Sequence, residues 1–289
     1  MQVVITGFVS GLEISLLALA FGVVYLPSRV FFLAMGGIYV AAPFLAKELS
    51  DRTGSWAFSL PVAIVSAILL SILADLGSHR PLSRRGASDG AHFVSSLGQY
   101  IFLMQVVVLI WGNDPQSFVP GVETIKTQFG GRVPLGQAIS AAACIAGLAA
   151  FYAWLLLSNV GLRLRALASN PMEMQLAGQS DTRLRTVAFG LSGALCALSS
   201  LAAARNVGFD PHTGMVATVS AIVATFIGGR YSYWGPFLGG LLVGAIRAAT
   251  VWSFGTRWQD VAVFLFLGCC LLLFPNGLLG HRQRVEYQP

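Results

Sequence analysis

Residues 158–185 read SNVGLRLRALASNPMEMQLAGQSDTRLR, a polar and basic segment between two strongly apolar runs. Arg163 and Arg165 lie near its start, and Arg183 and Arg185 lie at its end. Arginines concentrate in the cytoplasmic loops of membrane proteins, close to the ends of the spans. The segment therefore predicts a cytoplasmic loop, and we expect the rest of the chain to form a bundle of membrane helices around it.

A short helix is predicted inside this loop. Asn170 is a favourable N-cap, and Pro171 suits the first helical position. Glu173 stands three residues after the cap, which is the spacing of a capping box. Gly178 can end the helix in a left-handed conformation. The expected helix has about two turns.

One face of this short helix is apolar and flexible. Met172 and Leu176 are four residues apart and share that face, with Met174 close by. Methionine side chains adapt to irregular surfaces, and an apolar helix face is suited to dock into a groove of another protein. We predict that a soluble partner holds the membrane bundle at this helix.

The composition indicates an integral membrane protein. The 289 residues are 55% hydrophobic and 10% charged, whereas a soluble domain carries about 25% charged residues. The net charge of +6 comes from arginines at the ends of apolar runs, so it does not indicate nucleic-acid binding. The four cysteines lie in apolar runs and are interpreted as small buried side chains, with no metal site.

Nine apolar runs are long enough, or nearly long enough, to span a bilayer. They lie at about 4–26, 31–46, 56–77, 92–111, 136–157, 185–204, 215–228, 235–254 and 259–275. The runs 31–46 and 215–228 are short, and Gly36, Gly37 and Pro43 interrupt the first, so each could be a broken or re-entrant helix. We predict an all-α, polytopic membrane bundle of about eight or nine transmembrane segments, forming one domain over residues 1–289.

The distribution of basic residues gives an expected orientation. If 78–91 and 158–184 are both cytoplasmic, two spans separate them and the assignment is consistent. With nine crossings the N-terminus lies outside, the C-terminal tail lies inside, and arginines concentrate on the inner side. The longest outer loop, about 112–135, is a candidate gate or landing surface for an external partner. The N-terminus lacks a basic region typical of a cleavable signal peptide.

Small residues predict where helices pack closely. Gly235, Gly239, Gly240 and Gly244 have the spacing that lets two membrane helices approach backbone to backbone, as do Gly190 and Ala194. This pattern concerns the fold and not the chemistry of a site.

Two ionisable residues, Glu13 and Arg247, fall within predicted spans. A charge inside the bilayer usually faces a cavity or a partner. Three interpretations remain open: the two residues pair across the bundle, one of them meets a zwitterionic or polar substrate, or each lies near an interface and extends to it.

The turn GFDPHTG at residues 208–214 lies between two apolar runs. It is either a plain loop or the start of a half-helix whose first amides face a cavity. Such amides would suit a carboxylate or carbonyl of a substrate.

The sequence contains no motif of nucleotide hydrolysis or of common hydrolases. Neither of its two lysines, Lys47 and Lys126, follows a phosphate-binding glycine loop. The four histidines are scattered near the ends of spans, and neither a G-x-S-x-G nor an H-E-x-x-H motif occurs. We therefore expect a transport subunit, not an enzyme, with no cofactor of its own.

Four stretches of the second half carry a family resemblance. They are GLRLRALASN at 161–170, PHTG at 211–214, GGRYSYWGPFLGG at 228–240 and PNGLLG at 275–280. In this order they resemble motifs of the membrane permeases of branched-chain amino acid ABC importers, a group that includes urea and short-amide permeases. In the first half, FLAMG at 32–36 stands where that family has a stretch resembling N-F-A-H-G.

The resemblance implies that a separate ATPase supplies the energy. Cytoplasmic ATPase subunits would dock on the helix at about 171–177, within a coupling loop of about 158–185. A periplasmic binding protein would deliver the solute, and a second permease chain, related or identical, would complete a complex in the bacterial inner membrane. The expected ATPase-coupling residues are Arg163, Arg165, Asn170, Met172, Glu173, Leu176 and Gly178.

The expected solute is a branched-chain or other apolar amino acid, with urea or a short amide as the alternative. A secondary transporter or channel without an ATPase is the second functional class, and a membrane enzyme is the third. The expected substrate-path residues are Glu13, Met35, Gly36, Pro211, Gly214, Gly228, Gly229 and Arg247.

Overall fold

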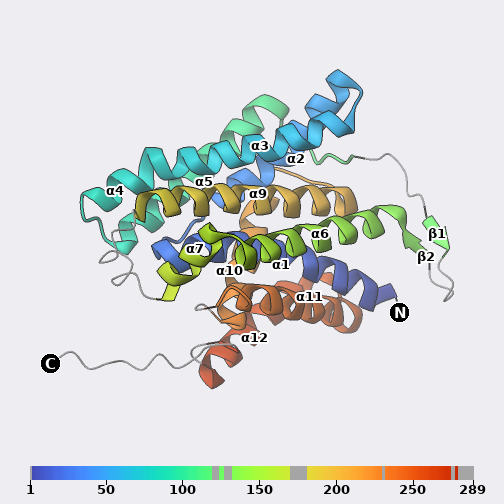
Figure 1. The fold of residues 1–289 in the computed structure, drawn as a ribbon. Coiled ribbons are helices and arrows are strands. Elements are labelled where there is room, and N and C mark those ends of the chain that lie inside the picture. Colours follow the sequence, from blue (N-terminus) through green and yellow to red (C-terminus); the bar gives the residue numbers. More distant parts are fainter. Residues whose placement is uncertain are drawn as a thin grey trace.

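The computed structural model describes residues 2–118, 124–126, 132–169, 181–229, 232–274 and 277–278. These residues form a helical bundle with one short hairpin (Figure 1). The first helices are α1 (Gln2–Ser28), α2 (Met35–Thr53), α3 (Trp56–Ala74), the π-helical turn η1 (Asp75–His79), α4 (Arg80–Arg84) and α5 (Asp89–Trp111). They are followed by α6 (Leu135–Leu157), α7 (Asn159–Ser169), α9 (Asp181–Val207), α10 (Thr213–Gly228), α11 (Gly235–Phe254), the 3-10 turn η2 (Thr256–Trp258) and α12 (Gln259–Leu273).

The hairpin lies in the loop between α5 and α6. Its strands β1 (Thr124–Lys126) and β2 (Arg132–Pro134) pair antiparallel. Figure 1 shows it beyond the bundle, at the same end as the N-terminus and opposite α4 and α7. The predicted fold class is confirmed, with this hairpin as an addition.

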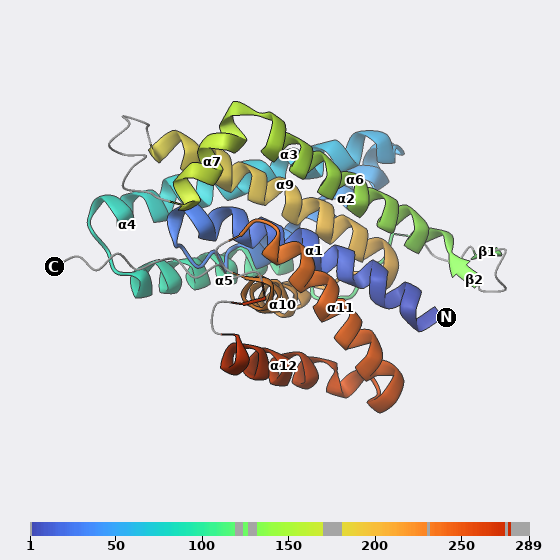
Figure 2. The same cartoon turned by 60° about the horizontal axis from the view of Figure 1, so that its bottom comes forward.

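Helix α1 forms the centre of the bundle. Every residue from Gly11 to Leu26 is buried, and α1 packs against α6, α9, α10 and α11. A helix that is apolar on all sides is stable only when other helices surround it. Figure 2 shows α12 at the edge of the bundle, away from α1, and α12 packs against α10 and α11.

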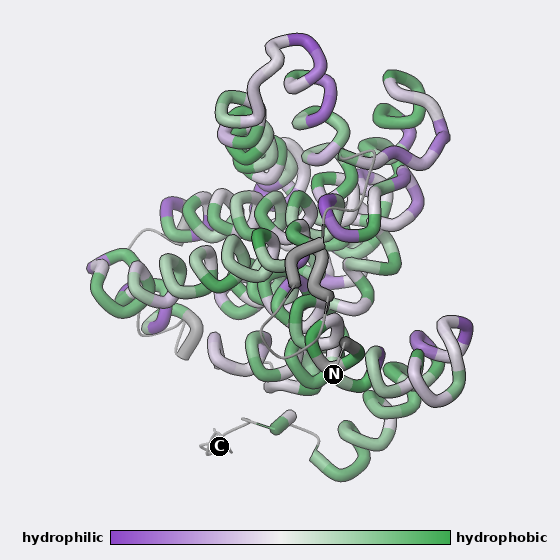
Figure 3. Tube along the Cα trace, turned by 90° about the vertical axis from the view of Figure 1, so that its right-hand side faces the viewer, coloured by the Kyte–Doolittle hydropathy of each residue, from purple (hydrophilic) through white to green (hydrophobic). Residues whose placement is uncertain are grey.

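Among the described residues, seven helical stretches are long and apolar enough to cross a membrane. They are Ile5–Ser28, Trp56–Arg84, Asp89–Trp111, Leu135–Leu157, Arg183–Val207, Gly235–Phe254 and Thr256–Leu273. The two other predicted runs, already noted as short, correspond to α2, whose second half is charged, and to α10, which has 16 residues. Figure 3 shows that the helices are mainly hydrophobic and that hydrophilic residues gather near their ends.

The predicted interruption of the second run is misplaced. Pro43 lies inside a continuous α2, and Gly36 and Gly37 belong to its first turn. The break falls earlier, at the non-helical residues 29–34, which include the buried Phe32. The Ala34 amide donates a hydrogen bond to Ser96 Oγ over 3.0 Å, which supplies the partner that irregular backbone needs inside a bundle.

The first turns of α2 and α10 meet inside the bundle. A Cβ added to Gly36 would lie 2.9 Å from the Gly214 carbonyl oxygen and 2.7 Å from Thr218 Oγ1. Only glycine fits such a backbone contact without a shift of the helices. Because residues 29–34 precede α2 and residues 208–212 precede α10, two irregular segments lead to this crossing.

The predicted glycine packing on α11 is confirmed. A Cβ on Gly240 would lie 2.5 Å from the Ser15 backbone nitrogen of α1, and Gly244 contacts Gly11. Ser15 Oγ also donates to the Phe237 carbonyl over 2.9 Å. On α9 the close contact is made by Gly193, which meets the α3 backbone, whereas Gly190 has only ordinary contacts.

Candidate functional site

A cavity of about 540 Å³ lies between α1, α2, α9, α10 and α11, beside the turn that precedes α10. Its buried wall includes Glu13, Ser199 and Val40, whereas Val207 and His212 in its lining are exposed. Residue Phe209 of the same turn pairs with Gln116, just after the end of α5. The cavity is thus an open vestibule beside the C-terminal end of α9. Figure 1 shows that this end of α9 lies on the same side of the bundle as the N-terminus and the hairpin.

Glu13 is buried in the vestibule wall, in the middle of α1. The Asn206 side-chain amide donates to Glu13 Oε1, and Ser199 Oγ donates to the Glu13 backbone carbonyl over 2.7 Å. Among the described residues, no cationic side chain pairs with this carboxylate. Glu13 therefore does not extend to an interface; it is a buried acid stabilised by one neutral donor.

Arg247 of α11 also lines the vestibule, but its carboxylate partner is Asp260 of α12. Arg247 Nη2 donates to Asp260 Oδ1 over 2.6 Å and to Ser220 Oγ over 2.7 Å. Arg247 Nε is buried without an acceptor among the described residues. The interpretation that Glu13 and Arg247 pair with each other is therefore wrong, although both line the same cavity.

The turn before α10 is a half-helix start whose amides are already occupied. Asp210 Oδ1 accepts hydrogen bonds from the amides of His212 at 2.7 Å and Thr213 at 3.1 Å. A carboxylate of the chain itself therefore satisfies the positive end of this helix. The alternative in which these amides bind a group of the substrate does not match the structure, because the Asp210 carboxylate already accepts their hydrogen bonds. Asp210 itself lines the vestibule.

Six predicted path residues form helix junctions and do not line the vestibule. They are Met35, Gly36, Pro211, Gly214, Gly228 and Gly229. Met35 is fully buried, Gly228 packs against the Gly235 backbone, and Gly229 connects α10 to the residues before α11 with a φ of 122°. These residues determine how the helices that surround the vestibule approach one another.

Several polar residues of the vestibule were not predicted from the sequence. Besides Asp210, the wall contains Tyr39, Ser199, Ser200, Ser220 and Gln259. Serines inside apolar runs only weakly indicate a binding site, because serine also occurs where membrane helices pack against one another. Asn206 and Asp260 lie near helix ends, and their contacts with Glu13 and Arg247 depend on the packing of helices distant in sequence.

The start of the predicted coupling loop is α7, which carries Arg163 and Arg165. Tyr233 Oη donates to the Leu164 carbonyl over 3.4 Å, and Tyr152 Oη donates to the Tyr233 carbonyl over 2.9 Å. Helix α7 is therefore joined to the connection between α10 and α11. The other coupling residues, Asn170, Met172, Glu173, Leu176 and Gly178, lie outside the described residues.

The end of the coupling loop, in the first turns of α9, is held by a buried polar cluster. Arg185 Nε lies 2.7 Å from Asp75 Oδ1, and Arg185 Nη1 donates to Ser83 Oγ over 2.8 Å. His79 Nδ1 and His92 Nδ1 are 3.3 Å apart beside this pair. The cluster thus ties α9 to η1, α4 and α5, and its members were not predicted as a group from the sequence.

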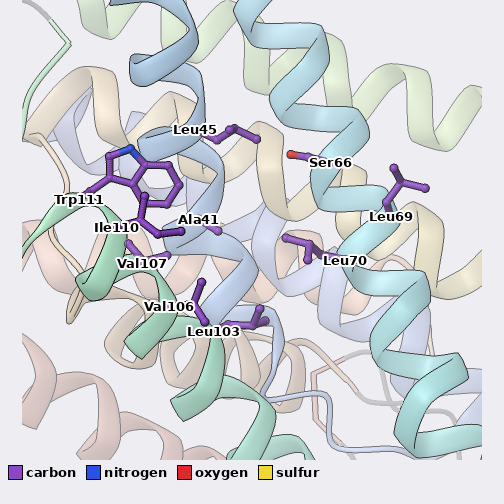
Figure 4. A pocket seen from close by; sticks show the side chains of 10 residues that line it. All are labelled: Ala41, Leu45, Ser66, Leu69, Leu70, Leu103, Val106, Val107, Ile110 and Trp111. Carbon is purple, nitrogen blue, oxygen red and sulfur yellow. The ribbon is translucent and has the colours of Figure 1, made fainter.

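A second cavity, of about 340 Å³, is apolar. It lies between α2, α3 and α5 and is lined by residues such as Leu45, Leu70 and Trp111 (Figure 4). Its serine, Ser66, donates to the Ala63 carbonyl of its own helix over 2.8 Å. A polar solute needs a few convergent polar groups for its orientation, so this cavity is a poor site for one.

Comparison with known proteins shows where this architecture recurs. A family model described as "Branched-chain amino acid transport system / permease component" matches residues 3–273. The chain is 26% identical to the high-affinity branched-chain amino acid transport system permease protein BraD of Pseudomonas aeruginosa, over 99% of this chain and 97% of that protein. It is 25% identical to the permease protein LivH of Escherichia coli, over 99% and 97% of the two chains.

Two further similarities extend the comparison. The autoinducer 2 import system permease protein LsrC of Escherichia coli is 30% identical over 72% of this chain and 58% of that protein. Among solved structures, PsaBC from Streptococcus pneumoniae in complex with a Fab aligns with a TM-score of 0.54 at 13% identity. That alignment covers 94% of this chain and 91% of the other, and it supports the fold alone.

Proposed function

The chain belongs to the family of branched-chain amino acid transport permeases, and we propose that it forms the translocation path for a branched-chain or other apolar amino acid. As a member of this family it is a multi-pass membrane transport subunit of an ATP-binding-cassette importer. It is not the catalytic subunit, and ATP is used by a partner ATPase.

The vestibule is the observation that carries this proposal. It combines a buried carboxylate, an arginine and several hydroxyl groups with apolar residues such as Leu17 and Val216. An ionisable residue inside a membrane bundle is energetically costly, and its presence therefore indicates a functional site. A volume of about 540 Å³ lies in the range of roughly 300–1,000 Å³ that is typical of small-molecule sites.

The crossing of Gly36 and Gly214 is the proposed closure of the path. Tyr39 and Val40, one turn after Gly36, line the vestibule, and so does Thr213, next to Gly214. Passage beyond the vestibule therefore requires the first turns of α2 and α10 to separate. A contact between two glycine backbones suits a closure because neither glycine has a side chain of its own that resists separation of the helices.

Coupling to the ATPase is proposed at residues 170–178, whose flanks are both joined to the bundle. Helix α7 is joined through Tyr233 to the connection before α11, and α9 is joined through Arg185 to η1. A force applied between these flanks by an ATPase would act on α10 and α11 on one side and on α3 and α5 on the other. Helices α10 and α11 line the vestibule, and α3 and α5 pack against α2, which carries Gly36 of the closure.

The remaining expectations follow from the family and from the distribution of charge. We propose that ATPase subunits bind the end of the bundle that carries α4 and α7, with the C-terminus on the cytoplasmic side. A periplasmic binding protein would deliver solute at the vestibule end, where the N-terminus lies outside. A second permease chain, homologous or identical, would complete the path in a bacterial inner membrane.

Reconstitution tests this function. The chain is purified with the ATPase, second permease and binding protein proposed as its partners, and placed in proteoliposomes containing ATP. We expect uptake of radiolabelled L-leucine that depends on ATP and on the binding protein. Uptake of urea or acetamide in place of leucine would support the short-amide alternative, and uptake without the ATPases would support a secondary transporter.

A further inference from the structure

Glu13 offers the vestibule a carboxyl group that has no cationic partner among the described residues. The carboxylate is buried, and among the described residues its one hydrogen-bond donor is Asn206, which contacts Oε1. An ionised carboxylate taken out of water is costly without a cationic partner. Since Glu13 lines the cavity, a cation that enters the cavity can supply the missing charge.

Arg247 offers the opposite charge, and its present partner is exchangeable. The Asp260 side chain is 46% exposed, and the Arg247 side chain is 19% exposed. An ion pair with a carboxylate this exposed contributes little to stability. Asp260 also lies in the first turn of α12, a helix that packs against α10 and α11. A second carboxylate in the vestibule can therefore compete with Asp260 for the guanidinium.

We propose that the vestibule binds the zwitterionic end of an α-amino acid, with the ammonium at Glu13 and the carboxylate at Arg247. The Asp260 carboxylate, which pairs with Arg247 in the structure, would give way to the substrate carboxylate. This inference rests on the proposed function and specifies how the substrate is recognised. It assigns the two charges of one ligand to two walls of one cavity.

The apolar part of the lining suits an uncharged aliphatic side chain. Ile14 and Leu17 on α1 and Val216 and Ala217 on α10 line the same cavity. Ser199 and Ser220 add hydroxyl groups next to Glu13 and Arg247, since Ser199 bonds the Glu13 carbonyl and Ser220 accepts from Arg247. A ligand with two opposite charges and an apolar tail matches this arrangement better than a neutral amide does.

Equilibrium binding with charge-deleted analogues tests the assignment. The probe is radiolabelled L-leucine, bound to the purified importer in nanodiscs without its binding protein. Competitors are 4-methylpentanoate, which lacks the ammonium group, and 3-methylbutylamine, which lacks the carboxylate. For the unaltered importer we expect each competitor to bind at least roughly tenfold more weakly than leucine, because each loses a charge-assisted hydrogen bond.

The variants are expected to lose different selectivities. Glu13→Gln should remove the preference for leucine over 4-methylpentanoate, and Arg247→Gln should remove the preference over 3-methylbutylamine. Asp260→Asn should strengthen leucine binding several-fold, because it removes the competing carboxylate. Glu48→Gln and Arg257→Gln are matched controls away from the cavity, and they should retain the selectivity of the unaltered importer.

The outcomes separate this inference from the proposed function. If the importer takes up leucine with ATP but both Glu13→Gln and Arg247→Gln keep full selectivity, the charge assignment is wrong and the function stands. Unchanged or weaker binding in Asp260→Asn contradicts the exchange at Arg247. If Glu13→Gln does not fold, Glu13→Asp replaces it, with a reduced but retained preference expected. If the unaltered importer neither binds leucine nor takes it up with ATP, the proposed function itself fails.

Discussion

Asp75 and Arg185 form an ion pair that connects the end of α3 with the start of α9. Arg185 Nε lies 2.7 Å from Asp75 Oδ1, and the Asp75 side chain is fully buried, whereas that of Arg185 is 13% exposed. The pair joins residues 110 positions apart in sequence. It lies directly after the segment proposed to meet the ATPase, so it affects both stability and the transmission of force.

Asp75→Asn should destabilise the protein strongly. Arg185 would keep its charge in a largely buried site without its partner, and loss of one member of a buried pair typically costs about 3–5 kcal/mol. Thermal unfolding of the purified permease in detergent measures the change. Arg52→Gln is the control, because it breaks the pair with Glu48, whose members are 75% and 36% exposed, and should change stability by less than about 1 kcal/mol. Equal effects of the two variants would contradict the buried role of Asp75.

Gly240→Ala should destabilise the contact between α1 and α11. The added Cβ would lie 2.5 Å from the Ser15 nitrogen, so the two helices would have to separate, at a cost of about 1–3 kcal/mol. Gly268→Ala in α12 is the matched control, because a Cβ there meets nothing within 4 Å. The control should be neutral or more stable by up to about 1 kcal/mol, as expected for alanine in a helix. Thermal unfolding that shows no difference between them would contradict the close packing.

Glu173→Ala and Gly178→Ala should leave the permease folded but reduce coupling. Glu173 lies in the predicted helix at 171–177 and Gly178 directly follows it, so loss of the capping box or of the C-terminal glycine frays the helix ends. ATP hydrolysis and leucine uptake are measured in the same proteoliposomes, and the ratio of solute transported to ATP hydrolysed should fall several-fold. Arg257→Ala, at the other end of the bundle, should keep the ratio. A normal ratio in both coupling variants argues against this contact.

Ala203→Cys should be labelled from the outside. Ala203 lines the vestibule, and the proposed orientation opens the vestibule to the periplasm. The experiment uses a background in which the four native cysteines are serine, with a membrane-impermeant maleimide on intact spheroplasts. L-leucine should slow the labelling of Ala203→Cys. Ala166→Cys, on α7, should be labelled only after the membrane is permeabilised, and the reverse pattern would invert the orientation.

The sequence predicted the helices and several of their contacts for clear physical reasons. Each of the nine apolar runs became a helix, because a backbone in lipid must satisfy its own hydrogen bonds. The Gly240 and Gly244 contacts followed from the spacing of small residues. The break at residues 29–34 was predicted at the wrong position, because Pro43 is a strong helix-breaking signal in the sequence. In the structure, neighbouring helices accommodate Pro43 inside α2.

The contacts of the charged residues could not be predicted from the sequence. Glu13 and Arg247, which the structure places in the lining of one cavity, were identified from the sequence as ionisable residues within spans. Their partners were not, because Asn206 and Asp260 lie near helix ends, where polar residues are ordinary. The buried cluster of Asp75, His79, His92 and Arg185 was missed for the same reason.

The sequence by itself determined that this chain crosses a membrane many times and where its helices lie, because lipid imposes a hydrophobic length and internal hydrogen bonding on each segment separately. Only the tertiary structure decided that Glu13 meets Asn206 on α9, that Arg247 meets Asp260 on α12, and that Gly36 touches Gly214. Such contacts join helices far apart in the chain, and they depend on the angle and depth at which each pair of helices packs, which no single segment specifies.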